Sequence, residues 1–112
     1  MKCIIAGGRD YIPNEESFNI VKSLVKHYKI TLIVSGHASG ADSFGETCAK
    51  KLKLKLKVFP ADWNKYGKRA GYIRNYEMGK YTDYVILFKG GKGTALMRDI
   101  AIKLNKKIIY EE

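Results

Sequence analysis

The segment with the clearest chemistry is a glycine-rich loop that opens into a helical pattern. Residues 89–98 read KGGKGTALMR and follow an apolar run. Gly90, Gly91 and Gly93 let backbone N–H groups approach a phosphate closely. Thr94 adds a hydroxyl, and the first turn of the helix supplies unpaired N–H groups and the positive end of its dipole. The order of strand, loop and helix predicts an anion site, with a phosphorylated nucleotide as its ligand.

Two further glycine-bearing loops follow predicted strands, GGRDY at 7–11 and SGHASGAD at 35–42. The loops that follow parallel strands share one edge of a sheet, so we expect the three loops to converge. The third loop lacks the Walker A spacing and the first lacks the full dinucleotide fingerprint, which disfavours a P-loop triphosphatase and an ordinary NAD enzyme. The predicted ligand-binding residues are Gly7, Gly8, Arg9, Asp10, Ser35, Gly36, Gly40, Asp42, Arg74, Asn75, Gly90, Gly91, Gly93 and Thr94.

The polar residues of these loops allow alternative interpretations. Arg9 binds phosphate while Asp10 binds a ribose hydroxyl, or the two form a structural pair that fixes the loop. Asp42 caps a helix or contacts a sugar. Glu46 follows four residues later on the same helix face, and the two carboxylates serve either as acid–base groups or as surface acids. His37 is an acid–base candidate without a visible partner.

Residues 60–78 interleave aromatic and basic side chains. Aromatic faces stack on bases and cations hold phosphates, whereas the alternative is a long connection anchored by buried rings. The side chains concerned are Trp63, Tyr66, Tyr72, Tyr76, Lys65, Lys68, Arg69 and Arg74. Within this segment we favour Arg74 and Asn75 as site residues, because they place a cation and an amide near a helix start.

Apolar runs rich in Ile, Val and Leu alternate with segments of helical periodicity. The runs predict strands at 2–6, 31–34, 55–59, 84–88 and 107–110. The periodic segments predict helices from 13–14 onward, from 40 or 41 to 52, and over 72–81 and 94–104, whereas 60–71 has no clear period. Five strands alternating with four helices favour an α/β fold in one domain over 1–112, with one parallel sheet covered by helices on both faces.

The chain carries 21 Lys and Arg against 11 Asp and Glu, a formal net charge of +10. This excess invites a nucleic-acid hypothesis. Most lysines fall on predicted helix faces or strand ends, which is typical of solvated surface. The arginines that fall in or beside glycine-bearing segments are Arg9, Arg69, Arg74 and Arg98. Because guanidinium groups bind phosphate bidentately, the pattern favours a small anionic ligand, and nucleic acid is the less favoured partner.

Neither cysteine has a partner at metal-ligand spacing. Cys3 falls in the first apolar run and Cys48 in a helical pattern, so we expect two small buried residues, no metal and no other cofactor. No apolar run approaches the ~20 residues of a membrane span, and the first residues lack the apolar region of a signal peptide. We therefore expect a cytoplasmic protein without a membrane partner.

Together these segments resemble the SLOG superfamily, which groups Smf/DprA and LOG proteins, and specifically its small YspA/YpsA-like members. The matching pieces are GGRDY at 7–11, VSGHASGAD at 34–42, FPADWNKYGKRAG at 59–71, IRNYEM at 73–78 and FKGGKGT at 88–94. The resemblance spans nearly the whole chain. It implies a Rossmann-like αβα sandwich and a pocket for a nucleotide or nucleotide derivative formed by these loops.

The resemblance also shows where this chain departs from its relatives. LOG relatives are phosphoribohydrolases that cut the base–ribose bond of nucleoside monophosphates, and their loop reads PGGxGTxxE with a catalytic Glu. Here Lys89 stands at the proline position and Met97 at the Glu position. His37 and Ser39 stand where relatives carry Gly and Arg, and Tyr72 where they often carry Pro. A thioether cannot replace a catalytic carboxylate.

Three functions follow as hypotheses. The first is a module that binds or senses a nucleotide or nucleotide-derived ligand. The second is an N-glycosidase of the phosphoribohydrolase kind that uses a displaced carboxylate, Glu46 or Asp42. The third is DNA binding, by analogy with DprA-like relatives and from the charge. Because LOG relatives associate, we also expect a homo-oligomer.

Overall fold

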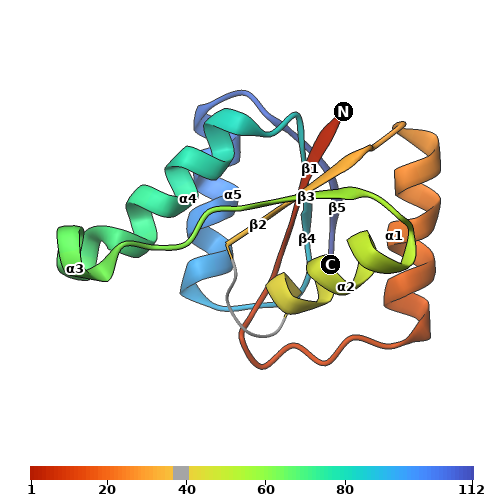
Figure 1. Ribbon diagram of the computed structural model, residues 1–112, viewed down its shortest axis with the longest axis horizontal. Coiled ribbons are helices and arrows are strands. Elements are labelled where there is room, and N and C mark those ends of the chain that lie inside the picture. Colours follow the sequence, from red (N-terminus) through yellow and green to blue (C-terminus); the bar gives the residue numbers. More distant parts are fainter. Residues whose placement is uncertain (37–40) are drawn as a thin grey trace.

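The computed structural model describes residues 1–36 and 41–112, and it forms one parallel sheet with helices on both faces. The strands are β1 (Lys2–Ala6), β2 (Leu32–Ser35), β3 (Lys55–Val58), β4 (Tyr84–Leu87) and β5 (Lys107–Glu111). The helices are α1 (Glu15–His27), α2 (Ala41–Lys51), α3 (Trp63–Tyr66), the 3₁₀ turn η1 (Gly67–Arg69), α4 (Ala70–Tyr81) and α5 (Lys92–Lys103). The predicted Rossmann-like α/β sandwich is confirmed (Figure 1).

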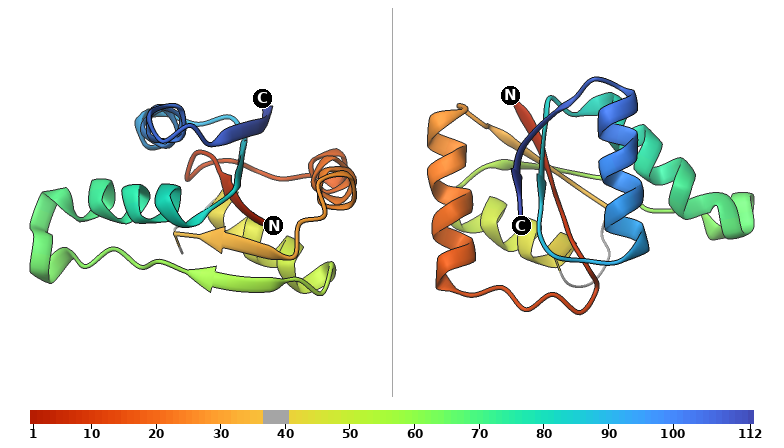
Figure 2. Two further views of the ribbon diagram at one scale, coloured as in Figure 1. Left: turned by 90° about the horizontal axis from the view of Figure 1, so that it is seen from above. Right: turned by 180° about the vertical axis from the view of Figure 1, so that it is seen from behind.

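The two faces of the sheet follow from the alternation of side chains along β1. Cys3 and Ile5 point to a core formed with α1 and α2, whereas Ile4 and Ala6 point to a second core formed with α4 and α5. All four side chains are buried. Figure 2 shows α1 on one side of the sheet and α4 with α5 on the other. A strand covered on both faces needs a continuous apolar run, which the sequence KCIIA supplies.

The strand order is β3-β2-β1-β4-β5. The chain builds the sheet outward from β1 to β3 and then returns to the other side of β1 with β4. Ile4 accordingly has Val34 of β2 as its neighbour on one side and Val85 of β4 on the other. The order therefore reverses between β1 and β4, and a ligand crevice is expected beyond the carboxyl ends of these two strands.

Helix α1 begins where its capping residues place it. The Asn14 side chain accepts a hydrogen bond of 2.9 Å from the backbone N–H of Ser17, and the Ser17 hydroxyl accepts one from the backbone N–H of Asn14. This reciprocal pair satisfies two N–H groups at the helix start. It also fixes the end of the loop that follows β1, which carries several of the predicted site residues.

Both cysteines are buried, as predicted. Cys3 lies in the core beneath α1 and α2, and Cys48 packs into the same core from α2. In the described part of the chain, no helix is both long and apolar enough to cross a membrane.

Candidate functional site

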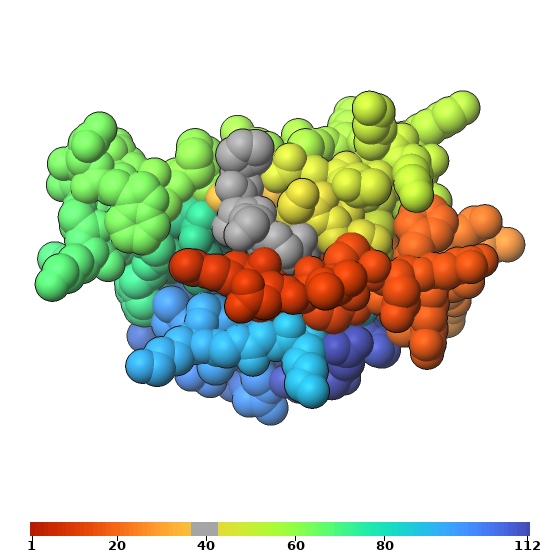
Figure 3. Space-filling model, turned by 90° about the horizontal axis from the view of Figure 1, so that it is seen from below, coloured from red at the N-terminus to blue at the C-terminus, as the bar shows by residue number. Residues whose placement is uncertain are grey.

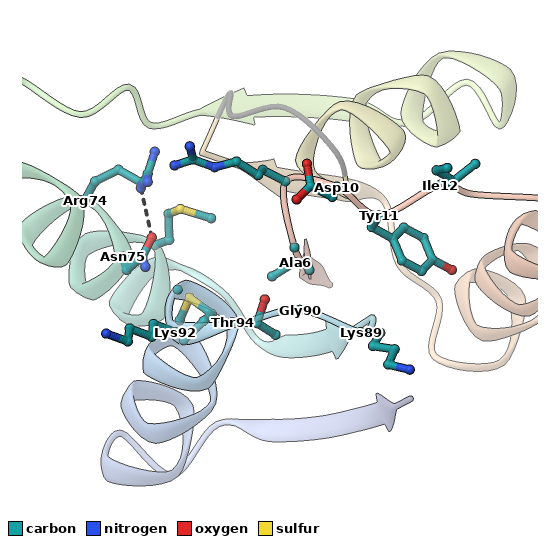
Figure 4. A pocket seen from close by; sticks show the side chains of 17 residues that line it. Ala6, Asp10, Tyr11, Ile12, Arg74, Asn75, Lys89, Gly90, Lys92 and Thr94 are labelled. Carbon is teal, nitrogen blue, oxygen red and sulfur yellow. Dashed lines mark hydrogen bonds between the residues drawn. The ribbon is translucent and has the colours of Figure 1, made fainter.

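A cleft of about 820 Å³ lies at the carboxyl ends of β1 and β4, where the strand order reverses. Its walls come from the loop after β1, the loop after β4 with the start of α5, and one side of α4 (Figure 4). Figure 3 shows the first of these loops running across the molecule between α2 and the start of α5. The predicted residues that line the cleft are Gly7, Gly8, Arg9, Asp10, Arg74, Asn75, Gly90, Gly91, Gly93 and Thr94.

The loops after β1 and β4 are joined by a backbone contact. The N–H of Gly8 donates a hydrogen bond of 3.0 Å to the carbonyl oxygen of Lys89. A Cβ on Gly90 would collide with the backbone of Gly8 and with the Thr94 hydroxyl, so the close approach of the two loops requires a glycine at this position. Gly90 therefore has a structural role, whatever it contributes to a ligand.

The other two glycines of the third loop border open space. A Cβ on Gly91 or Gly93 would have no heavy atom within 4 Å among the described residues. Gly91 is the N-cap of α5, and it offers no side chain to the N–H groups of the first turn. That turn also contains no acidic residue. The start of α5 thus presents its N–H groups and its positive dipole end to the cleft with space in front of them.

The Thr94 hydroxyl lies at the centre of this arrangement. Its oxygen is buried, and it has no hydrogen-bond partner among the residues that the structure describes. In Figure 4 the hydroxyl points from α5 toward the loop after β1. A buried hydroxyl without a partner costs about 1–3 kcal/mol, which a hydrogen bond to a bound group would recover. The oxygen is therefore placed to complete an anion site.

The charges of the cleft favour an anionic guest. Among its described lining residues, four are cationic and Asp10 is the one carboxylate. The four cations are Arg9, Arg74, Lys89 and Lys92. Arg9 and Asp10 are both exposed, and they form no ion pair with each other in the described structure. Their side chains are therefore available to a ligand.

Arg74 connects α4 to the carboxyl end of β2. Its Nη1 donates a hydrogen bond of 2.7 Å to the carbonyl oxygen of Gly36. Its Nε donates one of 2.8 Å to Oδ1 of Asn75, which Figure 4 shows as a dashed line. A Cβ on Gly36 would lie 2.9 Å from this Nη1, so the glycine makes room for the guanidinium. The predicted pair of Arg74 and Asn75 is thus placed together at the cleft wall.

Several predicted residues lie elsewhere. Ser35 and Glu46 are not among the cleft-lining residues, and the Ser35 hydroxyl donates a hydrogen bond of 2.9 Å to Oε2 of Glu46. Asp42 lies in the first turn of α2, where only its backbone is described. Gly40 and His37 lie outside the described residues. Catalytic roles for Glu46 and Asp42 stay predictions.

The structure adds lining residues that the sequence argument did not select. Tyr11 stacks on Phe88 with ring centroids 5.1 Å apart, and its hydroxyl lies 2.7 Å from that of Ser17. Burial raises the pKa of Tyr11. Met97, at the position where LOG relatives carry Glu, is buried and lines the cleft with Met78. Met78 follows Arg74 by four residues, a spacing that places both on one helix face and so could have identified it.

Comparison with known proteins agrees with this architecture. No curated protein and no solved structure is significantly similar to the chain. A family model, described as the YspA, cpYpsA-related SLOG family, matches residues 1–66. The matched part contains β1 with its glycine loop, β2, α2 and the segment around Trp63. Since the match covers more than half of the sequence, the chain belongs to the YspA, cpYpsA-related SLOG family.

Proposed function

We propose that the cleft binds a nucleotide or nucleotide-derived ligand through its phosphate. The observation that carries the proposal is the buried Thr94 hydroxyl without a partner, which lies beside the uncapped start of α5. Helix starts of this kind bind phosphate because their free N–H groups and dipole favour negative charge. Membership of a family linked to nucleotide-derived ligands supports the same assignment.

The remaining lining residues have roles in this proposal. The guanidinium of Arg9 binds the phosphate from the loop after β1, because it is exposed and unpaired within the described structure. Asn75 uses its carbonyl oxygen on Arg74, which leaves its amide nitrogen to donate to ribose or base. Asp10 accepts a hydrogen bond from a ribose hydroxyl.

We propose binding or sensing rather than hydrolysis. Met97 lines the cleft with a thioether, which cannot protonate a leaving group or activate water. Among the described lining residues, Asp10 is the one carboxylate, and it is exposed to solvent. The N-glycosidase hypothesis needs a carboxylate beside the bond that breaks. Neither the thioether of Met97 nor the exposed carboxylate of Asp10 favours it.

Titration calorimetry against nucleoside mono-, di- and triphosphates, dinucleotides and ADP-ribose derivatives tests the proposal. We expect saturable binding of at least one phosphate-bearing ligand and weaker or no binding of the matching nucleoside, because the phosphate supplies the main contact. No binding of any ligand at high micromolar concentration would refute the proposal. Chromatography of the same mixtures for free base and ribose 5-phosphate tests hydrolysis. If turnover appears and Glu46→Gln leaves it intact, Glu46 is not the catalytic group.

A further inference from the structure

Residues 62–72 form an arm that projects from one end of the molecule. The arm comprises α3, η1 and the first residues of α4, and it lies at one end of the longest dimension, which is 37 Å (Figures 1 and 2). The sheet and its two cores lie to one side of it. Ala70 is the one buried residue of the arm, and the others are exposed or partly exposed. The exposed side chains require an explanation other than packing.

Three large aromatic rings are concentrated on this arm. Trp63 is 60% exposed, Tyr66 39% and Tyr72 47%. Each ring has a neighbour on the arm or on α4. The Trp63 ring lies against Gly71, and Tyr72 stacks on Tyr76 with centroids 6.3 Å apart and planes at 14°. The Lys65 ammonium lies over the Tyr66 ring, 5.2 Å from its centroid. Such rings offer flat apolar faces to a partner, at little further cost in side-chain entropy.

The charges between the rings have one sign. Lys65, Lys68 and Arg69 are all exposed. Asp62 is the acidic residue of the arm, and its carboxylate accepts a hydrogen bond of 3.0 Å from the backbone N–H of Lys65 at the start of α3. That carboxylate is committed to the helix cap. The arm therefore combines open aromatic faces with a cationic surface.

We propose that the arm binds single-stranded DNA. Bases stack on the rings of Trp63, Tyr66 and Tyr72, while the phosphates pair with the cations between them. Aromatic stacking together with a cationic track is how proteins bind single strands without reading sequence. Neither base stacking nor phosphate pairing requires a 2′-hydroxyl, so DNA can make both contacts. The proposal is independent of the nucleotide cleft.

Two other occupants fit less well. A second copy of the chain packed arm to arm would bring Lys65, Lys68 and Arg69 against their own counterparts, and like charges oppose such an interface. Double-stranded DNA satisfies the cations but hides its bases, so the exposed rings would have nothing to stack on. Only a single strand uses both the rings and the charges.

Trp63 is the single tryptophan of the sequence, so its fluorescence reports directly on the arm. We expect an oligothymidylate of about 12 nucleotides to quench it saturably, with binding at least about tenfold weaker at 200 mM than at 50 mM salt. Light scattering of the mixture gives the stoichiometry. No quenching, and no anisotropy change of a labelled strand, at about 100 µM protein and 50 mM salt would overturn the proposal.

Charge-reversal variants distinguish the effect of the arm on strand binding from the effect of the protein's net charge. The arm variant Lys65→Glu, Lys68→Glu, Arg69→Glu should lose at least about tenfold in affinity. The matched variant Lys22→Glu, Lys26→Glu, Lys103→Glu changes the charge equally on α1 and α5, and it should lose distinctly less. Equal losses in the two variants would overturn the proposal. So would binding of the duplex that is tighter than that of oligothymidylate, or binding of oligouridylate that is more than about tenfold tighter. Arm-dependent dimers that exclude the strand would also overturn it.

Nucleotide binding in the cleft and strand binding on the arm can be refuted independently. The arm variant should bind a nucleotide in the cleft as the unchanged protein does, since none of its three positions lines the cleft. Thr94→Val should leave oligothymidylate binding unchanged. If Thr94→Val weakened strand binding as much as the arm variant, the strand would occupy the cleft and the arm assignment would be wrong.

Discussion

The guanidinium of Arg74 and the carbonyl oxygen of Gly36 are joined by a hydrogen bond of 2.7 Å across 38 positions of the chain. This bond ties α4, which covers one face of the sheet, to the carboxyl end of β2. It also holds Arg74 at the wall of the cleft, with Asn75 as its second partner. One side chain thus anchors the backbone at the end of β2 and contributes positive charge to the cleft.

Arg74→Lys should destabilise the fold, because an ammonium cannot bond Gly36 and Asn75 from the same position. We expect the free energy of unfolding to fall by about 1–2 kcal/mol, measured by urea denaturation. Gly36→Ala should also destabilise, since its Cβ would displace the guanidinium. In the double variant the loss should be smaller than the sum of the two, because both changes break one contact. Additive losses would contradict this coupling.

Thr94→Val should separate binding from stability. The substitution keeps the side-chain shape and removes a buried hydroxyl without a partner among the described residues. We expect the free energy of unfolding to stay the same or to rise by about 1 kcal/mol, whereas nucleotide affinity falls about five- to tenfold. Denaturation and calorimetry on the same preparation give both values. Unchanged affinity would show that the hydroxyl does not contact the ligand.

Gly93→Ala and Gly90→Ala form a matched pair on one loop. A Cβ on Gly93 enters open space at the start of α5, so we expect a gain in stability of about 0.5–1 kcal/mol and weaker nucleotide binding. A Cβ on Gly90 meets Gly8 and Thr94, so we expect a loss of about 1–3 kcal/mol. Thermal unfolding distinguishes the two. Equal destabilisation would contradict the described loop geometry.

The buried thiols predict a stability that declines in alkali. Burial raises the pKa of Cys48 from 9.0 to about 12 and raises that of Cys3 further. As the pH rises, these thiols ionise in the unfolded chain before they ionise in the folded protein. Their contribution to the free energy of unfolding is therefore fully present below pH 9 and is lost as the pH rises toward 12. Above pH 9, each thiol contributes a slope that approaches about 1.4 kcal/mol per pH unit.

Urea midpoints between about pH 8 and 10 measure this slope. Cys48→Ala should reduce the pH slope by the contribution of one thiol. It should also lower the free energy of unfolding at pH 8, because the core loses packing contacts. The same slope in the variant would show that groups other than Cys48 ionise in this range.

The sequence predicted the sheet well, because strands buried on both faces are continuous apolar runs. The run 2–6 coincides with β1, and the other predicted strands agree with the structure to within one residue at either end. The start of the last helix was predicted at Thr94, whereas α5 begins at Lys92. Gly91 caps it without a side chain, so the sequence carried no Ser, Thr, Asp or Asn to mark the start.

The segment 60–71 shows no clear period in the sequence, yet it contains α3, η1 and the first residues of α4. These short turns bury few side chains, so they leave no apolar periodicity to detect. The side-chain cap of Asp62 on Lys65 is the local signal that could have revealed α3. The alternation of strands and helices along the sequence could not give the strand order, because that order depends on where each crossover returns to the sheet. The meeting of the loops after β1 and β4 follows from the strand order, so it could not be predicted either.

The central strand acquires its two neighbours at very different times. Lys2 donates its N–H to Oδ2 of Asp83 at 2.8 Å, a contact that spans 81 positions of the chain. During synthesis β1 can pair with β2 early, but its other edge stays open until β4 has left the ribosome. A chain interrupted before that moment exposes an unpaired edge to its neighbours and lacks one wall of the cleft.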